Sequence, residues 1–218
     1  YRIMKKIVLV LGLFICCNAN VFSQNPFKAE VQEIQNRYTN LKKQGKTIVF
    51  TGSSSVRMWP SVSDLTPENT IINTGFGGSQ ARDLWRHKEA LIIQFQPHQV
   101  FIYEGDNDLF AGVHPRKIKR TTKKIIRAIQ KNNKQTQIVL IAAKPSISRW
   151  ELKTKYLQLN NLFKRLAAKK EQLIYADVWH PMLKEGALDK SLFVSDGLHM
   201  NQKGYAIWES VLKPLILK

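Results

Sequence analysis

From residue 25 onward, short runs of consecutive apolar residues alternate with longer segments in which apolar residues recur every three or four positions. The continuous runs predict strands buried on both faces, and the longer segments predict amphipathic helices. The predicted strands lie at residues 48–50, 71–72, 100–103, 138–141 and 173–175. The predicted helices lie at residues 27–41, 84–92, 115–133, 152–166 and, after a cap at Asn201, 201–215.

This alternation indicates one fold class. Five apolar strands separated by amphipathic helices are typical of a parallel sheet covered on both faces, so the sequence predicts an α/β fold, a three-layer α/β/α sandwich with a five-stranded parallel sheet. The chain contains no internal repeat, low-complexity segment or linker, and we expect residues 24–218 to form a single domain. Such sheets bind ligands beyond the carboxyl ends of their strands. The polar residues that follow the strands are therefore the candidates for chemistry.

The first 23 residues have a different pattern. Arg2, Lys5 and Lys6 precede an apolar run at 7–15, and small polar residues follow. This arrangement is typical of a secretory signal peptide, and the run is shorter than the ~20 residues that span a bilayer. We expect residues 1–23 to be removed and the mature chain to be periplasmic or secreted. A lipid-modified cysteine at 16–17 is an alternative, although Ile15 stands where such a site needs a small residue.

The charge and the cysteines narrow the possible partners and chemistry. The chain has 34 Lys and Arg against 16 Asp and Glu, a net charge of +18, and without residues 1–23 the net charge is +15. A basic surface attracts anionic partners, such as an acidic polymer or a membrane surface. Both cysteines lie within residues 1–23, so the mature chain has neither thiol chemistry nor cysteine-bound zinc. Eight basic residues occur in one predicted helix: Arg116, Lys117, Lys119, Arg120, Lys123, Lys124, Arg127 and Lys131.

Three serines follow the first predicted strand, in the segment Gly52-Ser53-Ser54-Ser55. A serine in a tight turn between strand and helix can present its hydroxyl above the sheet, beside helix N-terminal amides that stabilise an oxyanion. The same pattern occurs where a serine only caps the next helix. The segment lacks the second glycine of the Gly-x-Ser-x-Gly elbow, which argues against an ordinary α/β-hydrolase.

The next two strands also end in polar or glycine-rich segments. The glycines at 75–78 can bring backbone amides close to a ligand or can form a tight turn. They do not complete the Gly-x-Gly-x-x-Gly pattern of dinucleotide-binding proteins. In the segment 104–108, the amide of Asn107 can donate a hydrogen bond to a developing negative charge. The carboxylates beside it do not predict a metal site, because neither histidine nor cysteine accompanies them.

A candidate base follows the last strand. Asp196 and His199 are three residues apart, so the carboxylate can reach the imidazole, select its tautomer and leave it free to act as a general base. We expect no such partner for the other histidines, His87, His98, His114 and His180. Acyl transfer requires a nucleophilic hydroxyl, hydrogen-bond donors for the oxyanion and a base with a residue that orients it. The sequence places a serine hydroxyl, backbone amides, an amide side chain and an Asp–His pair at one edge of the predicted sheet.

These segments resemble the blocks of the SGNH hydrolases, also called GDSL-type esterases and lipases, over nearly the whole mature chain. Residues 52–55 resemble the Gly-Asp-Ser-Leu block, with Ser53 in place of the aspartate. Residues 105–108 match Gly-x-Asn-Asp in full, and residues 196–199 match Asp-x-x-His in full. The segments 144–146 and 204–208 resemble the branch similar to platelet-activating-factor acetylhydrolase.

The resemblance implies a flavodoxin-like SGNH fold and a serine esterase that needs no cofactor and no metal. It makes Ser54 the nucleophile, with Ser53 or Ser55 as the fallback because three serines adjoin. It makes His199 the base and Asp196 the residue that orients it. The implied oxyanion donors are the amides of Ser54 and Gly78 and the side chain of Asn107. The implied substrates are small-acyl esters, such as O-acetylated sugars, or lysophospholipid-like esters.

A second hypothesis is a non-catalytic protein on the same fold that holds an acidic glycan or lipid with its basic helix. A solvated outer face with lysine stems over an apolar stripe explains that helix equally well. The pair of Asp196 and His199 favours the enzyme, because a protein that only binds would not need both. A role in nucleic-acid binding has no recognition motif to support it. The oligomeric state does not follow from the sequence.

Overall fold

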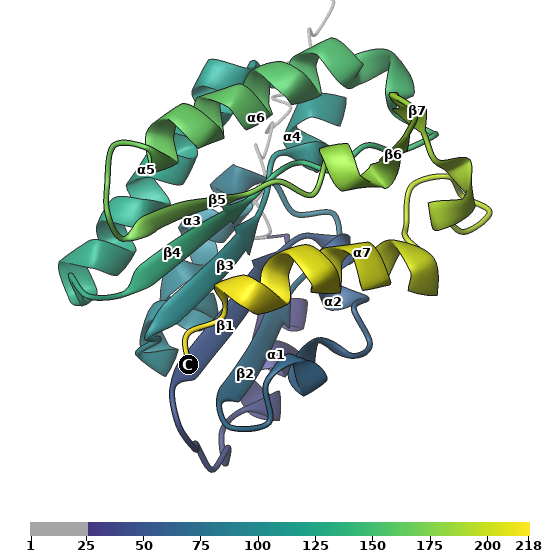
Figure 1. The fold of residues 1–218 in the computed structure, drawn as a ribbon. Coiled ribbons are helices and arrows are strands. Elements are labelled where there is room, and N and C mark those ends of the chain that lie inside the picture. The colour runs from purple at the N-terminus through teal and green to yellow at the C-terminus, as the bar shows by residue number, and fades with distance from the viewer. Residues whose placement is uncertain (1–25) are drawn as a thin grey trace, which may run out of the picture.

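A computed structural model describes residues 26–218, which form a parallel sheet between layers of helices (Figure 1). The predicted signal peptide, residues 1–23, lies outside the described residues, and the single-domain boundary stays a prediction. The five strands are ordered β2-β1-β3-β4-β5. Their bounds are β1 Thr47–Gly52, β2 Thr70–Gly75, β3 Gln99–Tyr103, β4 Gln137–Ile141 and β5 Leu173–Ala176.

The strand order determines where the site lies. All four pairings in this sheet are parallel, and the order is that of flavodoxin-like proteins. The strand after β1 is added on one side of it, as β2, whereas β3, β4 and β5 are added on the other side. The order in which strands are added therefore reverses between β1 and β3, while the strands themselves stay parallel. Ligands of such sheets bind at this reversal, beyond the carboxyl ends of the strands. The segments that follow Gly52 and Tyr103 occupy that position.

Helices cover both faces of the sheet, as Figure 1 shows. On the face behind the sheet, α3 (Ala81–Leu91) packs against α5 (Pro115–Asn132), and α5 packs against α6 (Lys153–Ala167). The first helix, α1 (Lys28–Arg37), packs beside α3, whereas α7 (Gln202–Leu212) lies on the front face. The three-layer α/β/α sandwich predicted from the sequence is confirmed. None of the helices within the described residues is long and apolar enough to cross a membrane.

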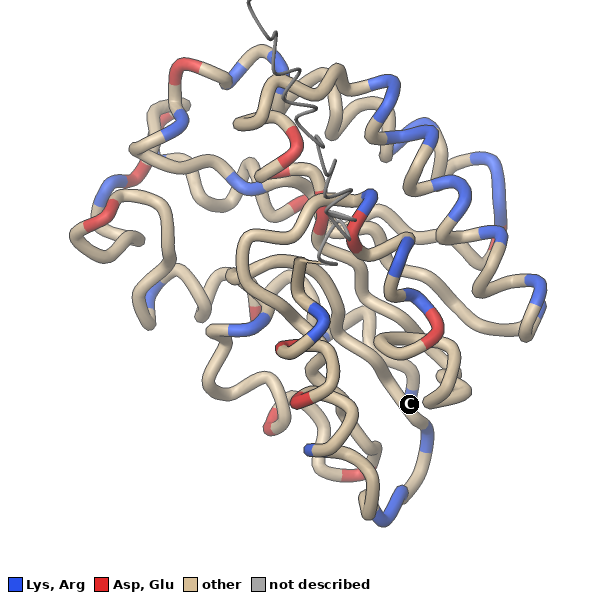
Figure 2. The backbone as a smooth tube through the Cα atoms, turned by 180° about the vertical axis from the view of Figure 1, so that it is seen from behind, with Lys and Arg blue, Asp and Glu red and all other residues tan. Residues whose placement is uncertain are grey.

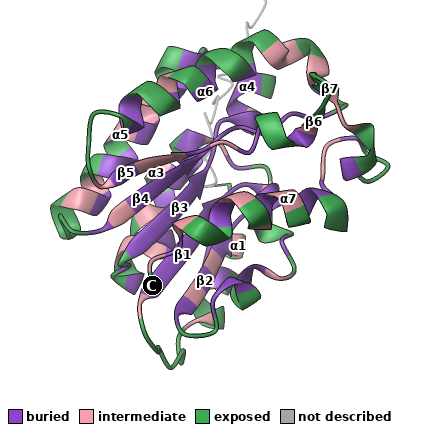
Figure 3. Cartoon of the chain, in the orientation of Figure 1, coloured by how far each residue is buried: buried purple, intermediate pink, exposed green. Residues whose placement is uncertain are grey.

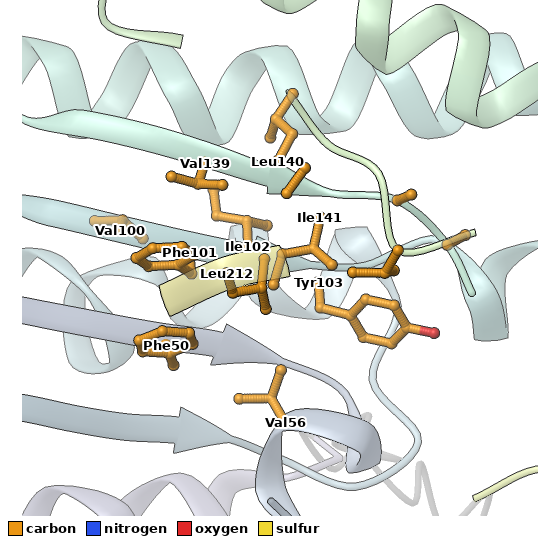
Figure 4. Packing of buried hydrophobic residues seen from close by; sticks show 14 of the residues in the cluster. Phe50, Val56, Val100, Phe101, Ile102, Tyr103, Val139, Leu140, Ile141 and Leu212 are labelled. Atoms are coloured by element: carbon orange, nitrogen blue, oxygen red, sulfur yellow. The ribbon is translucent and has the colours of Figure 1, made fainter. Parts of the chain in front are cut away.

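The core explains why the strands are continuously apolar. Every residue of β1 and β3 is buried, because helices cover both faces of these central strands (Figure 3). The rings of Phe50 and Phe101 stack with centroids 4.2 Å apart, and Figure 4 shows them side by side in the core. On the front face, Trp208 of α7 packs edge-on against Tyr103 at 4.9 Å. Each such aromatic pair stabilises the fold by roughly 0.5–1.5 kcal/mol beyond the burial of its area.

Several elements differ from the sequence prediction. The first helix ends at Arg37 rather than at residue 41, and Leu41 is exposed. Two short helices, α2 (Ser54–Arg57) and α4 (Asp106–Phe110), were not predicted, and neither was the hairpin of β6 (Leu183–Lys184) and β7 (Ala187–Leu188). These elements are too short to show a period in the sequence. The same holds for 3-10 turns at Val62–Leu65, Ile93–Phe95, Trp150–Leu152, His180–Met182, Lys190–Leu192 and Lys213–Leu215.

Candidate active site

The turn after β1 presents one of the three serines to the edge of the sheet. Gly52 has a φ of 132°, and a Cβ atom there would lie 1.9 Å from the carbonyl oxygen of Tyr103. Only glycine therefore allows β1 to approach β3 this closely before the chain turns into α2. Ser53 and Ser55 are buried, with 2% and 3% of their surface exposed, whereas Ser54 is half-buried at the first position of α2.

A chain of hydrogen bonds joins Ser54 to the loop before α7. The Oγ atom of Ser54 lies 2.9 Å from Nε2 of His199. On the other side of the ring, Nδ1 of His199 lies 2.6 Å from Oδ2 of Asp196. This contact places the proton on Nδ1, because the carboxylate only accepts, and leaves Nε2 free to accept the proton of the serine hydroxyl.

The aspartate of this chain is held in its ionised form. Its second oxygen, Oδ1, accepts hydrogen bonds from the backbone amides of Leu198 at 2.8 Å and His199 at 2.9 Å. Burial opposes ionisation, but the hydrogen bonds from the His199 side chain and these two amides lower the pKa of Asp196 to about 2. The carboxylate therefore carries its charge at neutral pH and can stabilise a protonated imidazole.

A buried lysine supports the loop that carries Asp196 and His199. Lys144 follows β4 and has no exposed surface, and its Nζ atom donates to the carbonyl oxygen of Leu198 at 2.6 Å. Burial lowers the pKa of Lys144 to about 8, against the opposing charge of Asp106. Nearby, the amides of Ile147 and Ser148 donate to the carbonyl of Gly197 at 2.8 and 3.1 Å. Two segments far apart in the sequence are thereby joined directly beside the imidazole.

Three hydrogen-bond donors follow the neighbouring strands β2, β1 and β3. The amide of Ser54 begins α2 and has no acceptor within that helix. The amide of Gly78 follows β2 at an exposed turn with a φ of 73°. Within residues 26–218 neither amide donates a hydrogen bond. The third donor, the side-chain amide of Asn107, lies in α4 after β3.

The side chain of Asn107 is held by two contacts. Its Nδ2 atom donates to the carbonyl oxygen of Ser79 at 2.9 Å, and its Oδ1 atom accepts from Nη1 of Arg149 at 3.1 Å. Because a guanidinium only donates, the contact with Arg149 identifies the oxygen side of the amide. The remaining hydrogen on Nδ2 can therefore be donated to a ligand.

The aspartates on either side of Asn107 have internal partners. Asp106 accepts hydrogen bonds from Arg149 at 2.6 Å and from the hydroxyl of Tyr156. Burial alone would raise the pKa of Asp106, but the charges of Lys144 and Arg149 outweigh burial and lower it. Asp108 accepts from the amide of Ala81 at 3.0 Å at the start of α3, and burial raises its pKa to about 6.

Within residues 26–218 no three His, Cys, Asp or Glu side chains are grouped to hold a metal ion.

One expectation about the histidines is wrong. His180 also has an aspartate three residues before it, and its Nδ1 atom lies 2.7 Å from Oδ2 of Asp177. Its side chain is 70% exposed and lies in the 3-10 turn after β5. Two Asp-x-x-His pairs therefore exist in the described chain, and the hydrogen bond to Ser54 belongs to His199.

Exposed apolar side chains lie in the segments that carry or adjoin these groups. Met58 is 46% exposed and follows α2, where its amide donates to the carbonyl of Ser54 at 2.8 Å. Phe110 is 62% exposed at the end of α4, and the guanidinium of Arg149 lies 4.4 Å from its ring centroid. Two further exposed apolar residues are hydrogen-bonded to the loop 196–199 through their backbones. The amide of Ile147 donates to the carbonyl of Gly197, and the amide of Val194 donates to the carbonyl of His199. Exposed apolar side chains beside a polar site are candidates for contact with an apolar part of a ligand.

Arg149, Lys144 and Phe110 were not singled out for the site from the sequence. Lys144 stands at the end of the apolar run Ile138-Val139-Leu140-Ile141-Ala142-Ala143, which was a signal that a charged side chain would be buried. No comparable signal marks Arg149, because its partners lie more than forty residues away in the chain.

Comparison with known proteins identifies the family of the chain. The sequence model of the GDSL-like Lipase/Acylhydrolase family matches residues 44–207, whereas no curated protein sequence matches the chain. A solved structure from Streptococcus pneumonia, of a protein named after platelet activating factor, is similar with a TM-score of 0.75 and 23% identity, covering 86% of this chain and 92% of that chain. A GDSL-like lipase from Bacteroides thetaiotaomicron VPI-5482 has a TM-score of 0.70 and 21% identity, covering 86% and 97%.

A third similar structure is a catalytic mutant of an acetylxylan esterase from Geobacillus stearothermophilus, with a TM-score of 0.66 and 16% identity, covering 81% of this chain and 97% of that chain. At these identities the similarity of the three structures shows the fold. The family match extends over most of the sequence and confirms the resemblance predicted from the residues. The chain belongs to the GDSL-like lipase/acylhydrolase family and is a carboxylic ester hydrolase.

Proposed function

We propose that the mature chain is an exported serine esterase that uses Ser54 as its nucleophile. His199 takes the proton of the Ser54 hydroxyl as oxygen attacks the ester carbonyl, and Asp196 stabilises the resulting imidazolium. The tetrahedral intermediate collapses when His199 returns this proton to the leaving alcohol. Water then attacks the acyl-enzyme with His199 as base, which releases the acid and restores Ser54.

The negative oxygen of each tetrahedral intermediate needs hydrogen-bond donors. The amides of Ser54 and Gly78 and the Nδ2 group of Asn107 supply them in this proposal. The observation that carries the proposal is the hydrogen-bond chain from Ser54 Oγ to His199 at 2.9 Å and from His199 to Asp196 at 2.6 Å. Export is supported by the pattern of residues 1–23 alone.

Two classes of ester are candidates for the substrate. Small-acyl esters such as O-acetylated sugars are suggested by the sequence resemblance, and one protein of similar fold is an acetylxylan esterase. Lysophospholipid-like esters are favoured by the exposed apolar side chains of Met58, Phe110, Ile147 and Val194. The non-catalytic binding protein considered from the sequence is not supported, because the family is one of ester hydrolases.

The test is hydrolysis of p-nitrophenyl esters from acetyl to palmitoyl by the wild-type chain and by Ser54→Ala, Ser53→Ala and Ser55→Ala. Loss of the nucleophile should lower kcat by a factor of ~10⁴ or more while the melting temperature stays close to that of the wild type. Ser53→Ala and Ser55→Ala are the matched controls, because each removes the hydroxyl of a serine that adjoins Ser54 in the chain. Wild-type turnover in Ser54→Ala would assign the nucleophile to another residue.

A further inference from the structure

The two neighbouring helices α5 and α6 form a strongly basic face of the molecule. They carry twelve Lys and Arg residues and no Asp or Glu. Figure 2 shows these basic residues close together on the two helices at the upper right. Within residues 26–218 none of the twelve forms an ion pair with a carboxylate. The charges of this face are therefore available to an external anion.

A groove runs between these helices. Its first hollow, of about 450 Å³, begins at His114 and Arg116 and reaches Leu162 and Arg165. A second hollow of about 500 Å³ shares Leu162 and Arg165 with the first and continues along Lys119 and Lys123 of α5 to Lys169. A third hollow, of about 580 Å³, shares no lining residue with these two; it lies between the C-terminal part of α5 and the segment 170–172 and has one acidic neighbour, Glu171. We call these three hollows the basic groove.

The dimensions of the basic groove suit a single extended chain. It follows the 18 residues of α5, and a helix of that length extends over about 27 Å. Its width is limited because packed helices lie about 8–10 Å apart between axes. The lining of the first two hollows combines the apolar side chains Leu162 and Leu166 with Lys and Arg side chains and, in the first hollow, the amides Gln158 and Asn161.

We propose that the basic groove binds a linear acidic polysaccharide, with its carboxylate or sulfate groups against the Lys and Arg side chains. A bilayer is a less suitable partner, because Leu157 is the one large apolar side chain that α5 and α6 expose within the described residues. Single-stranded nucleic acid binds by stacking its bases on aromatic rings, and the basic groove has no Phe, Tyr or Trp side chain in its lining. A duplex is wider than the space between two packed helices.

The basic groove also has a defined position relative to Ser54. Helix α5 begins at Pro115, after the loop that follows α4, and runs from the carboxyl edge of the sheet to the opposite edge, where β4 starts. The first hollow of the groove, at the start of α5, therefore lies toward the same edge of the sheet as the proposed catalytic residues. Binding in it does not depend on the proposed esterase mechanism, so the two proposals can fail separately.

The experiment measures binding of oligogalacturonides of increasing length by calorimetry at fixed ionic strength, with maltooligosaccharides as the neutral control. The test variant carries Lys119→Gln, Lys123→Gln and Arg165→Gln in the basic groove. The matched control carries Lys42→Gln, Lys190→Gln and Lys203→Gln, which remove the same charge from exposed positions elsewhere. Circular dichroism and hydrolysis of p-nitrophenyl acetate show that each variant is folded with an intact site.

We expect affinity for oligogalacturonides to rise with chain length until the chain fills the groove, and no binding of the neutral sugars. The groove variant should lose a factor of ~10 or more in affinity, about 1.4 kcal/mol, whereas the control should stay close to the wild type. Equal losses in the two variants would overturn the proposal, because general attraction would then explain the binding. It would also be overturned if duplex DNA or anionic vesicles bound the groove and oligogalacturonides did not.

Discussion

Lys144 offers a sharp test of how the loop that carries Asp196 and His199 is held, because its ammonium group is entirely buried beside that loop. The substitution Lys144→Met keeps a long unbranched side chain and removes the charge and the donor. In the wild type this group donates to the carbonyl oxygen of Leu198, and it is influenced by the charges of Asp106, Arg149 and Asp196. The substitution leaves Asp106 with its ion pair to Arg149.

The effect on stability depends on pH. Burial lowers the pKa of Lys144 from 10.5 to about 8 in the folded chain. Between pH 8 and pH 10.5 the unfolded chain therefore keeps a proton that the folded chain has lost, so the free energy of unfolding rises with pH. Relative to Lys144→Met, which lacks this group, the wild type should gain about 2 kcal/mol between pH 7 and pH 9.5.

Urea unfolding of both proteins at the two pH values measures this difference. Parallel pH dependence in the wild type and Lys144→Met would refute the reasoning, because it would show that the lysine keeps its proton in the folded chain. The second readout is activity at pH 7. Without the donor, the carbonyl of Leu198 loses its partner and the loop is held less precisely, so kcat should fall by a factor of ~10 or more with little change in KM. Lys203→Met, at an exposed position that follows the same loop, is the control and should leave kcat unchanged.

Two further substitutions test individual groups. Asn107→Ala should lower kcat by a factor of ~10²–10³ with a smaller effect on KM, because the oxyanion needs this donor more than the ground-state ester does; an unchanged kcat in steady-state assays would remove Asn107 from the mechanism. Glu104 is buried, and burial raises its pKa well above the usual range, while Ser79 donates to one of its oxygens at 2.8 Å. The folded chain thus keeps a proton that the unfolded chain loses as the pH rises above 4.5, so Glu104→Gln should become more stable relative to the wild type as the pH is raised from 5 to 7. Denaturant unfolding at the two pH values checks this, and a constant difference would show that Glu104 ionises inside the fold.

The fold was largely predictable because both kinds of element leave a long signal in the sequence. A strand buried on both faces needs a continuous apolar run, as in residues 100–103, and the helix over 115–132 repeats its isoleucines at helical spacing. The order of the strands leaves no such signal, because pairing depends on contacts between distant segments. The helices α2 and α4 were missed since one turn of helix is shorter than the period that would reveal it.

The candidate site was predictable where its residues fall in short segments of fixed spacing. Residues 105–108 and 196–199 could be recognised in this way, and burial separates Ser54 from its neighbours only once the turn after Gly52 is folded. The supporting contacts could not be predicted. Arg149 and Asn107 are hydrogen-bonded although they lie 42 residues apart in the sequence, and Lys144 and Leu198 although they lie 54 apart. Neither contact therefore leaves a local pattern in the sequence.

The two Asp-x-x-His pairs show the limit of spacing as evidence. Asp177 with His180 and Asp196 with His199 have the same offset and almost the same contact, 2.7 Å and 2.6 Å between Nδ1 and Oδ2. An aspartate three residues before a histidine fixes only the side of the ring that bears the proton. The partner of the other ring nitrogen depends on the fold, and it is Ser54 for His199.

These pairs therefore form a matched experiment within one chain. His199→Ala should lower kcat for p-nitrophenyl acetate by a factor of ~10³ or more, because no other base reaches the hydroxyl of Ser54 in the described residues. His180→Ala removes an equally paired but 70% exposed imidazole and should leave kcat within a factor of ~2 of the wild type. If His180→Ala were the variant that lost turnover, or if both lost it equally, the contact between His199 and Ser54 would not be the catalytic one. The comparison separates the chemistry from the local motif, because both variants lose the same pair at the same spacing and differ in what the fold places on the far side of the ring.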